Sequence, residues 1–123
     1  MLKAILLVGL GGGLGSILRY LTTVLSNKLF HISFPLGTFI VNIAGCFIIG
    51  LLLGWCESHA TVHSHFKFLF ITGFCGGFTT FSTFSAESMK LFESGNTLMA
   101  LLYIGSSVLI GLFAVGCGFW LIK

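Results

Sequence analysis

Four long apolar stretches, at about residues 4–24, 35–55, 67–92 and 97–122, are separated by short polar segments. A transmembrane helix needs about 20 consecutive, mostly apolar residues. Each stretch is therefore long enough to cross a membrane, and four spans leave only about 40 residues for loops and ends. The pattern predicts a single all-α integral membrane domain with four transmembrane helices and no room for a soluble domain.

The third stretch differs from the others in length and composition. It has about 26 residues where a straight span needs about 20. A glycine pair (Gly76-Gly77) and a threonine pair (Thr79-Thr80) also interrupt its apolar run. We therefore expect a broken helix, with half-helices over residues 68–74 and 81–92 and a non-helical crossing over residues 75–80.

A break at membrane depth has a chemical consequence. Each backbone N–H or C=O group left unsatisfied there costs several kcal/mol, so the crossing needs a partner from protein, water or an ion. The N-terminus of the second half-helix presents positive partial charge to an anion, whereas carbonyl groups freed at Gly76 and Thr79 suit a cation. This segment is the candidate functional site.

The composition fits a membrane protein. Hydrophobic residues make up 56% of the chain and charged residues only 7%, and the mean hydropathy is +1.09. Because four short helices enclose little volume, an ion pathway within one copy is hard to build, and we expect an oligomer. The four cysteines form no Cys-x-x-Cys pair, and we interpret them as small packing residues.

The second span carries a stripe of small and polar residues at helical spacing. Thr38 and Asn42 belong to it, followed by Gly45 and Cys46. Asn42 lies well inside hydrocarbon depth, where two interpretations remain open. Its amide either makes an interhelical hydrogen bond, worth about 0.6 to 2 kcal/mol, or donates an N–H to a polar path.

Two further sets of side chains point to such a path. In the fourth span, Tyr103 and Ser107 fall four residues apart on one face, and a tyrosine at that depth needs a partner for its hydroxyl. After the break, Phe81 and Phe84 share a face at i, i+3. Phenylalanine stripes are usually packing or lipid contacts, but here Ser82, Thr83 and Ser85 stand between and beside the rings, which favours a protected surface. We also expect Glu87 to pair with Lys90 at i, i+3.

The first span contains a glycine cluster and ends in a charge. Gly9-x-x-x-Gly13 and Gly11-x-x-x-Gly15 place glycines on adjoining faces, where another helix can approach closely. Arg19 follows near the far end of this span. It is either an interfacial anchor or a cation that draws anions into a vestibule.

The loop between the second and third spans holds His59, His63 and His65 beside Glu57. On a helix, His59 and His63 would share a face and suit a metal ion. Nothing in the surrounding sequence supplies further ligands or supporting groups. We therefore interpret these histidines as solvated loop residues.

Charge gives no preferred orientation in the membrane. With four spans, the two chain ends and the central loop share one side. The basic residues on the two sides are equal in number: Lys3, Lys67 and Lys123 on one, and Arg19, Lys28 and Lys90 on the other. Because the positive-inside rule then favours neither orientation, the chain is expected to insert both ways and to form an antiparallel homodimer.

Three segments together resemble the small bacterial fluoride channels called Fluc or CrcB. They are GGLGSILRY at residues 12–20, PLGTFIVNIAG at residues 35–45 and TTFSTF at residues 79–84. The resemblance covers the whole chain, and the third segment is the most specific. It implies a dual-topology antiparallel dimer in the cell membrane with two pores that release fluoride passively and so lower cytoplasmic fluoride toxicity.

The resemblance also implies roles for individual residues. Phe81 and Phe84 would turn ring edges to the ion, Asn42 would be the pore amide, and Tyr103 and Ser107 would form a hydroxyl track. The full candidate anion pathway is Phe81, Phe84, Asn42, Thr38, Ser82, Thr83, Tyr103, Ser107 and Arg19, the last as the vestibule arginine. The carbonyl groups of Gly76 and Thr79 would hold a structural sodium ion at the two-fold axis. Gly111 stands where some members have a further serine.

Three other classes are weighed against this hypothesis. A small antiparallel multidrug exporter needs a carboxylate in its first span, and the three acidic residues are Glu57, Glu87 and Glu93. A structural subunit of a larger membrane complex would show no activity alone. An enzyme is not expected, because no nucleophile, base and orienting group converge, and the expected partners are fluoride, a second copy and membrane lipid rather than nucleic acid.

Overall fold

The computed structural model describes residues 1–59 and 61–122, and the regular elements in those two ranges are all helical. In chain order they are α1 (Leu2–Leu29), α2 (Leu36–Ser58), α3 (Ser64–Phe66), the π-helix η1 (Lys67–Cys75), α4 (Gly76–Phe78), α5 (Phe81–Glu93) and α6 (Thr97–Ile122). Four helical paths are long and apolar enough to cross a membrane, the third running over Ser64–Glu93. The all-helical, four-span prediction is confirmed. Lys123, used in the charge count, lies outside the described residues.

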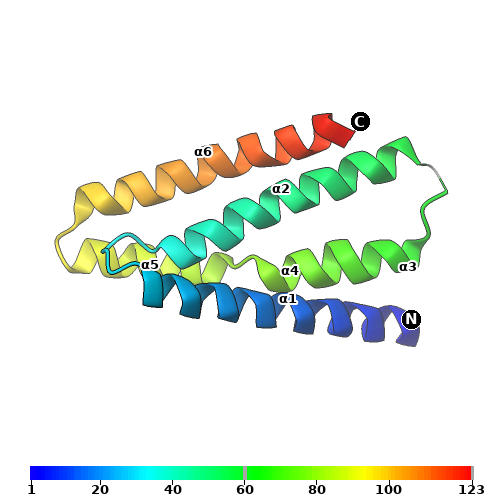
Figure 1. Ribbon diagram of the computed structural model, residues 1–123, viewed down its shortest axis with the longest axis horizontal. Helices are drawn as coiled ribbons and strands as arrows, with labels where there is room; N and C mark the ends of the chain where they lie inside the picture. Colours follow the sequence, from blue (N-terminus) through cyan, green and yellow to red (C-terminus); the bar gives the residue numbers. More distant parts are fainter. Residues whose placement is uncertain (60, 123) are drawn as a thin grey trace.

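The four paths lie side by side in the order α6, α2, third path, α1 (Figure 1). The beginning of α1, the end of α6 and the α2–α3 connection share one end of the molecule. The α1–α2 connection and the α5–α6 turn share the other. Helix α1 continues to Leu29, beyond the end predicted near residue 24, and Lys28 in its last turn interacts favourably with the negative end of the helix dipole.

The first span packs on the third through glycine. A Cβ atom added to Gly15 would lie 2.7 Å from the backbone nitrogen of Phe78, and one added to Gly11 would lie 2.9 Å from that of Phe74. By contrast, a Cβ atom at Gly13 would meet nothing within 4 Å. Of the two predicted glycine faces, the one with Gly11 and Gly15 is therefore the packing face.

The second and fourth spans approach each other in the same way. A Cβ atom at Gly50 would lie 3.0 Å from the backbone of Val115, and one at Gly118 would lie 2.8 Å from the nitrogen of Leu51. Lipid tails are as apolar as leucine, so helices in a membrane gain little from hiding apolar side chains from lipid. Close backbone contact at small residues is what holds such helices together.

In the third path, the residues beyond the length of a straight span lie in a π-helix rather than in a long non-helical crossing. Cys75 and Gly76–Phe78 are helical, and the extended residues are Thr79 and Thr80 alone. The predicted non-helical crossing over residues 75–80 is therefore too long. The π-helix over Lys67–Cys75 takes up residues instead, because its i→i+5 hydrogen bonds make a wider helix that advances less per residue.

We expect Gly15→Ala to lower the free energy of unfolding by about 1–3 kcal/mol, because the added methyl group meets the backbone of the third span at a tightly packed contact. The measurement is the thermal or denaturant unfolding of the purified protein in detergent. Gly13→Ala is the matched control, since it adds the same methyl group where there is space. Equal stability of the two variants would show that this contact does not hold the helices together.

Candidate functional site

The helical path of the third span stops at Thr79 and Thr80, whose hydroxyl groups both make hydrogen bonds to the backbone. Thr79 and Thr80 have extended backbones, with φ, ψ of −86°, 158° and −149°, 121°. The Thr79 hydroxyl donates to the Cys75 carbonyl at 2.8 Å, closing the end of α4. The Thr80 hydroxyl oxygen accepts the Thr83 N–H at 3.2 Å and so caps the start of α5.

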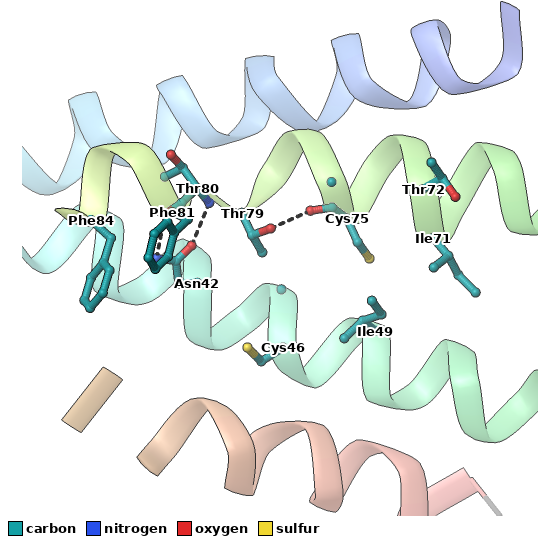
Figure 2. Close-up of a pocket in the computed structure, with 12 residues that line it drawn as sticks. Asn42, Cys46, Ile49, Ile71, Thr72, Cys75, Thr79, Thr80, Phe81 and Phe84 are labelled. Atoms are coloured by element: carbon teal, nitrogen blue, oxygen red, sulfur yellow. Dashed lines mark hydrogen bonds between the residues drawn. The ribbon is translucent and has the colours of Figure 1, made fainter. Parts of the chain in front are cut away.

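Asn42 joins the second span to this interruption with both ends of its amide. The Thr80 N–H donates to Asn42 Oδ1 at 2.8 Å, and Asn42 Nδ2 donates to the Thr80 carbonyl at 3.1 Å (Figure 2). In a continuous α-helix the Thr80 N–H would reach the carbonyl four residues earlier, that of Gly76. One side chain therefore satisfies two backbone groups of Thr80 and takes the usual donor away from Gly76.

Arg19 reaches the same segment from the first span. Its Nε donates to the Gly77 carbonyl at 3.0 Å. In a continuous helix that carbonyl would accept from Phe81, the first residue of α5. The Arg19 side chain is half-buried. Its position is therefore set by the hydrogen bond to the Gly77 carbonyl and not only by the membrane surface.

A pocket of about 440 Å³ lies beside Thr79 and Thr80. Helices α2, α5 and the end of the π-helix line it, mostly with apolar side chains (Figure 2). Asn42 supplies an amide to it, Gly76 and Thr79 belong to its wall, and Phe81 and Phe84 line it from the other side of the interruption. The two rings lie 5.9 Å apart at 46°, and Phe81 is 78% exposed.

A buried polar group lies on the other side of Phe84. The rings of Phe84 and Tyr103 are 5.0 Å apart. Tyr103 is fully buried, and its hydroxyl donates to Glu87 Oε1 at 3.0 Å. Thr38, 3% exposed, lies within hydrogen-bonding reach of the same hydroxyl. The expected Glu87–Lys90 pair is wrong, because Glu87 turns inward to Tyr103 instead.

Glu87 and Thr38 also line a second, more polar pocket of about 480 Å³, formed by the end of α1, the α1–α2 connection and the end of α5. Lys90 lines it as well. Phe84 thus stands between an apolar pocket at the interruption and a polar one near the helix ends. The side chains of Phe81, Phe84 and Tyr103 follow one another in a row between them.

Ser107 lies one helical turn beyond Tyr103 on α6. Its Oγ is buried and has no hydrogen-bond partner among the described residues. A buried hydroxyl without a partner costs about 1–3 kcal/mol, so its position calls for a ligand or water. One turn further, Gly111 packs against Cys46, since a Cβ atom there would lie 3.4 Å from the Cys46 sulfur.

Ser82 and Thr83 lie apart from the two pockets. Ser82 is exposed, its hydroxyl is 3.5 Å from that of Thr80, and neither residue lines either of the two pockets. The Thr83 N–H serves the cap of α5. Their predicted place beside the phenylalanine rings comes from sequence adjacency, whereas residues next to each other on a helix point in different directions.

Sequence reasoning missed three contributors: Thr80, Gly77 and Glu87. Threonine is a preferred N-cap residue. Thr80, directly before the helical run that begins at Phe81, could therefore have placed the start of α5. Glu87 could have been found by asking which acceptor a deep Tyr103 hydroxyl can reach. The Gly77 carbonyl has no signal in the sequence.

We expect Asn42→Ala to destabilise the protein by about 1–3 kcal/mol, because it leaves both backbone groups of Thr80 without a partner in a half-buried site. Hydrogen exchange should report the site directly, with faster exchange of the Thr80 amide. Asn27→Ala, an exposed asparagine on α1, is the matched control. An unchanged exchange rate at Thr80 would contradict the role assigned to Asn42.

Comparison with known proteins places this geometry in a family. The family model described as CrcB-like protein, Camphor Resistance (CrcB), matches residues 6–119. A Flavobacterium psychrophilum protein named fluoride-specific ion channel FluC is 50% identical over 122 residues, 99% of this chain and 98% of the relative. Proteins of the same name from Azobacteroides pseudotrichonymphae and Nitratidesulfovibrio vulgaris are 46% and 44% identical, covering 97% and 95% of this chain and 95% and 94% of their own. A match of this extent, over all four spans and the interruption, shows that the chain belongs to the CrcB-like family.

Proposed function

We propose that this protein is a fluoride-selective channel of the cell membrane that lets fluoride leave the cell passively. The observation that carries the proposal is the succession of the Phe81, Phe84 and Tyr103 rings, together with a buried Ser107 hydroxyl, one helical turn from Tyr103 on α6, that has no partner among the described residues. Relatives across the whole chain carry the name fluoride-specific ion channel. A channel of this kind is not an enzyme.

The chemistry of the row suits a small, strongly hydrated anion. A selective path has to replace the water around such an ion with hydrogen-bond donors and positive edges of aromatic rings. Asn42 uses one of its two Nδ2 hydrogens on Thr80 and keeps the second for an anion in the adjoining pocket. None of these groups carries a full positive charge, so the ion is not trapped.

The role proposed for Tyr103 depends on its hydrogen bond to Glu87. Its hydroxyl has a single hydrogen, and the hydrogen bond to Glu87 occupies it. An anion passing this point competes with Glu87 for that hydrogen, while the Thr38 hydroxyl beside it supplies a second donor. The Glu87 carboxylate repels anions, so it should make Tyr103 a barrier in the path rather than a binding site.

The working unit in this proposal is an antiparallel homodimer with two pores and a broken third helix in each copy. The pocket at the interruption includes the 78% exposed Phe81 ring, an apolar surface suited to a second copy. Equal numbers of basic residues on the two sides support insertion in both orientations. Labelling a cysteine placed beside Lys123 from each side of the membrane tests this, and labelling from one side only contradicts it.

We also propose that a sodium ion lies between the two copies, held by the carbonyl groups of Gly76 and Thr79. The Gly76 carbonyl has lost its helical donor to Asn42, and the Thr83 N–H that would serve Thr79 in a helix donates to the Thr80 hydroxyl. Two copies then offer four uncharged oxygens, a set that suits a monovalent hard cation better than a divalent one. The ion supplies positive charge that offsets the cost of unpaired carbonyl groups.

Fluoride efflux from liposomes that contain only this protein tests the function. We expect fluoride to leave and chloride to be retained, and we expect Phe81→Ile or Phe84→Ile to lower the fluoride flux by about tenfold or more, the equivalent of about 1.4 kcal/mol. Isoleucine fills much of the space but has no ring edge for an anion. Phe113→Ile, at a 72% exposed position of α6, is the control and should leave flux unchanged.

Two results would contradict the proposal. Equal flux of fluoride and chloride, or flux of neither, removes the selectivity on which it depends. Undiminished fluoride flux in both phenylalanine variants, with dimers as stable as those of the unaltered protein, leaves the two rings a packing role only.

Removal of sodium tests the cation site separately. After long equilibration with a bulky organic cation in place of sodium, we expect both fluoride flux and dimer stability to fall, because the Gly76 and Thr79 carbonyl groups lose their common partner. Returning sodium should restore both, whereas sodium should not exchange during turnover. Unchanged flux and dimer stability would show that these carbonyl groups hold no required cation.

A further inference from the structure

Four basic residues lie near the starts of the first and third spans, namely Lys3, His63, His65 and Lys67. Lys3 on α1 is close enough to His65 on α3 for an electrostatic interaction. The rings of His63 and His65 stack with centroids 4.4 Å apart and planes at 29°. Lys67 follows His63 at i, i+4 on a helical segment and is exposed. We call these four residues the basic cluster.

A hydrogen bond fixes which ring nitrogen of neutral His63 carries the hydrogen. The His65 backbone N–H donates to His63 Nδ1 at 3.3 Å, and His63 is the N-cap of α3. Because Nδ1 is the acceptor, the ring hydrogen of neutral His63 is on Nε2. The His63 ring therefore offers a donor away from its own backbone.

Few negative groups oppose the cluster. The chain has three acidic residues; Glu87 and Glu93 lie in α5, towards the opposite end of the molecule, and Glu57 lies near the end of α2. His59, next along that connection, is already paired through Nδ1 with the Trp55 carbonyl at 3.0 Å. The charged and titratable groups of the described residues at this end thus include Lys3, Lys67, the amino terminus at Met1, the three loop histidines, Glu57 and Cys56.

The level of the cluster in the membrane follows from its aromatic neighbours. The rings of Trp55 and Phe66 lie 4.8 Å apart with their planes tilted at 53°, and Phe66 is adjacent to His65 in the chain. Tryptophan rings concentrate at the level of the lipid headgroups. His65 and Lys67 flank Phe66 in the chain, so the basic cluster lies near the level of the headgroups.

We propose that the basic cluster binds the phosphate group of an anionic phospholipid. Lysine ammonium groups and the His63 Nε2–H are suitable donors for a phosphate oxygen.

The lipid preference can be measured at the cluster itself. Trp120→Phe leaves Trp55 as the reporting tryptophan, since the chain has two. In this background, quenching of Trp55 by brominated phosphatidylglycerol is compared with quenching by brominated phosphatidylcholine in mixed liposomes. We expect a preference for phosphatidylglycerol, and about a fivefold loss of it for each lysine removed in Lys3→Gln and Lys67→Gln.

Matched variants separate the cluster from overall charge. Lys28→Gln with Lys90→Gln removes the same charge at the opposite end and should leave the preference unchanged. His63→Gln with His65→Gln should lower the preference for phosphatidylglycerol at unchanged fluoride flux, which keeps this inference independent of the proposed function. Equal quenching by the two lipids overturns the proposal, as does an equal loss in the Lys28/Lys90 control. Release of phosphatidylglycerol by low concentrations of inorganic phosphate would show a free-phosphate site and overturn the lipid assignment.

Discussion

The structure depends on satisfying the backbone of Thr79 and Thr80 at membrane depth. Water cannot reach hydrocarbon to do this, so each N–H and C=O group released there has to be matched by a protein group or an ion. Asn42 from α2 pairs with both backbone groups of Thr80, Arg19 from α1 pairs with the Gly77 carbonyl, and the Thr80 hydroxyl pairs with the Thr83 N–H. The interruption is thus the point at which three of the four spans are tied together by hydrogen bonds.

Glycine packing makes those hydrogen bonds reachable. Arg19 meets the Gly77 carbonyl because α1 lies against the third span at Gly11 and Gly15. On the other side, a Cβ atom on Gly45 would overlap the Thr79 side chain, so α2 also runs close to the interruption. Larger residues at these positions would move the helices apart by more than a hydrogen bond tolerates. Packing and polar satisfaction are therefore parts of one arrangement.

This arrangement explains how an apolar protein can hold a polar path. The groups that restrain the backbone (Asn42, Arg19 and Thr80) are kept in place by two-way or charged hydrogen bonds. Of the groups in the proposed path, Phe84 lines the same pocket as Asn42 and Thr80, Tyr103 packs on Phe84, and the Ser107 hydroxyl has no partner among the described residues. A rigid framework with one unsatisfied hydroxyl is a suitable host for a small ion that exchanges its water for fixed donors.

The sequence alone predicted the four spans and an interruption of the third, which it placed over residues 75–80 and the structure confines to Thr79 and Thr80. Apolar length and helical spacing are local properties, so a single sequence carries them. It did not determine that Asn42 restrains Thr80 with both ends of its amide, that Tyr103 donates to Glu87, or that Ser82 and Thr83 lie apart from the pockets. Each of these depends on which helix faces which, and at what height. Helix packing decides that through contacts between glycines and backbone atoms far apart in the chain, such as Gly15 and Phe78.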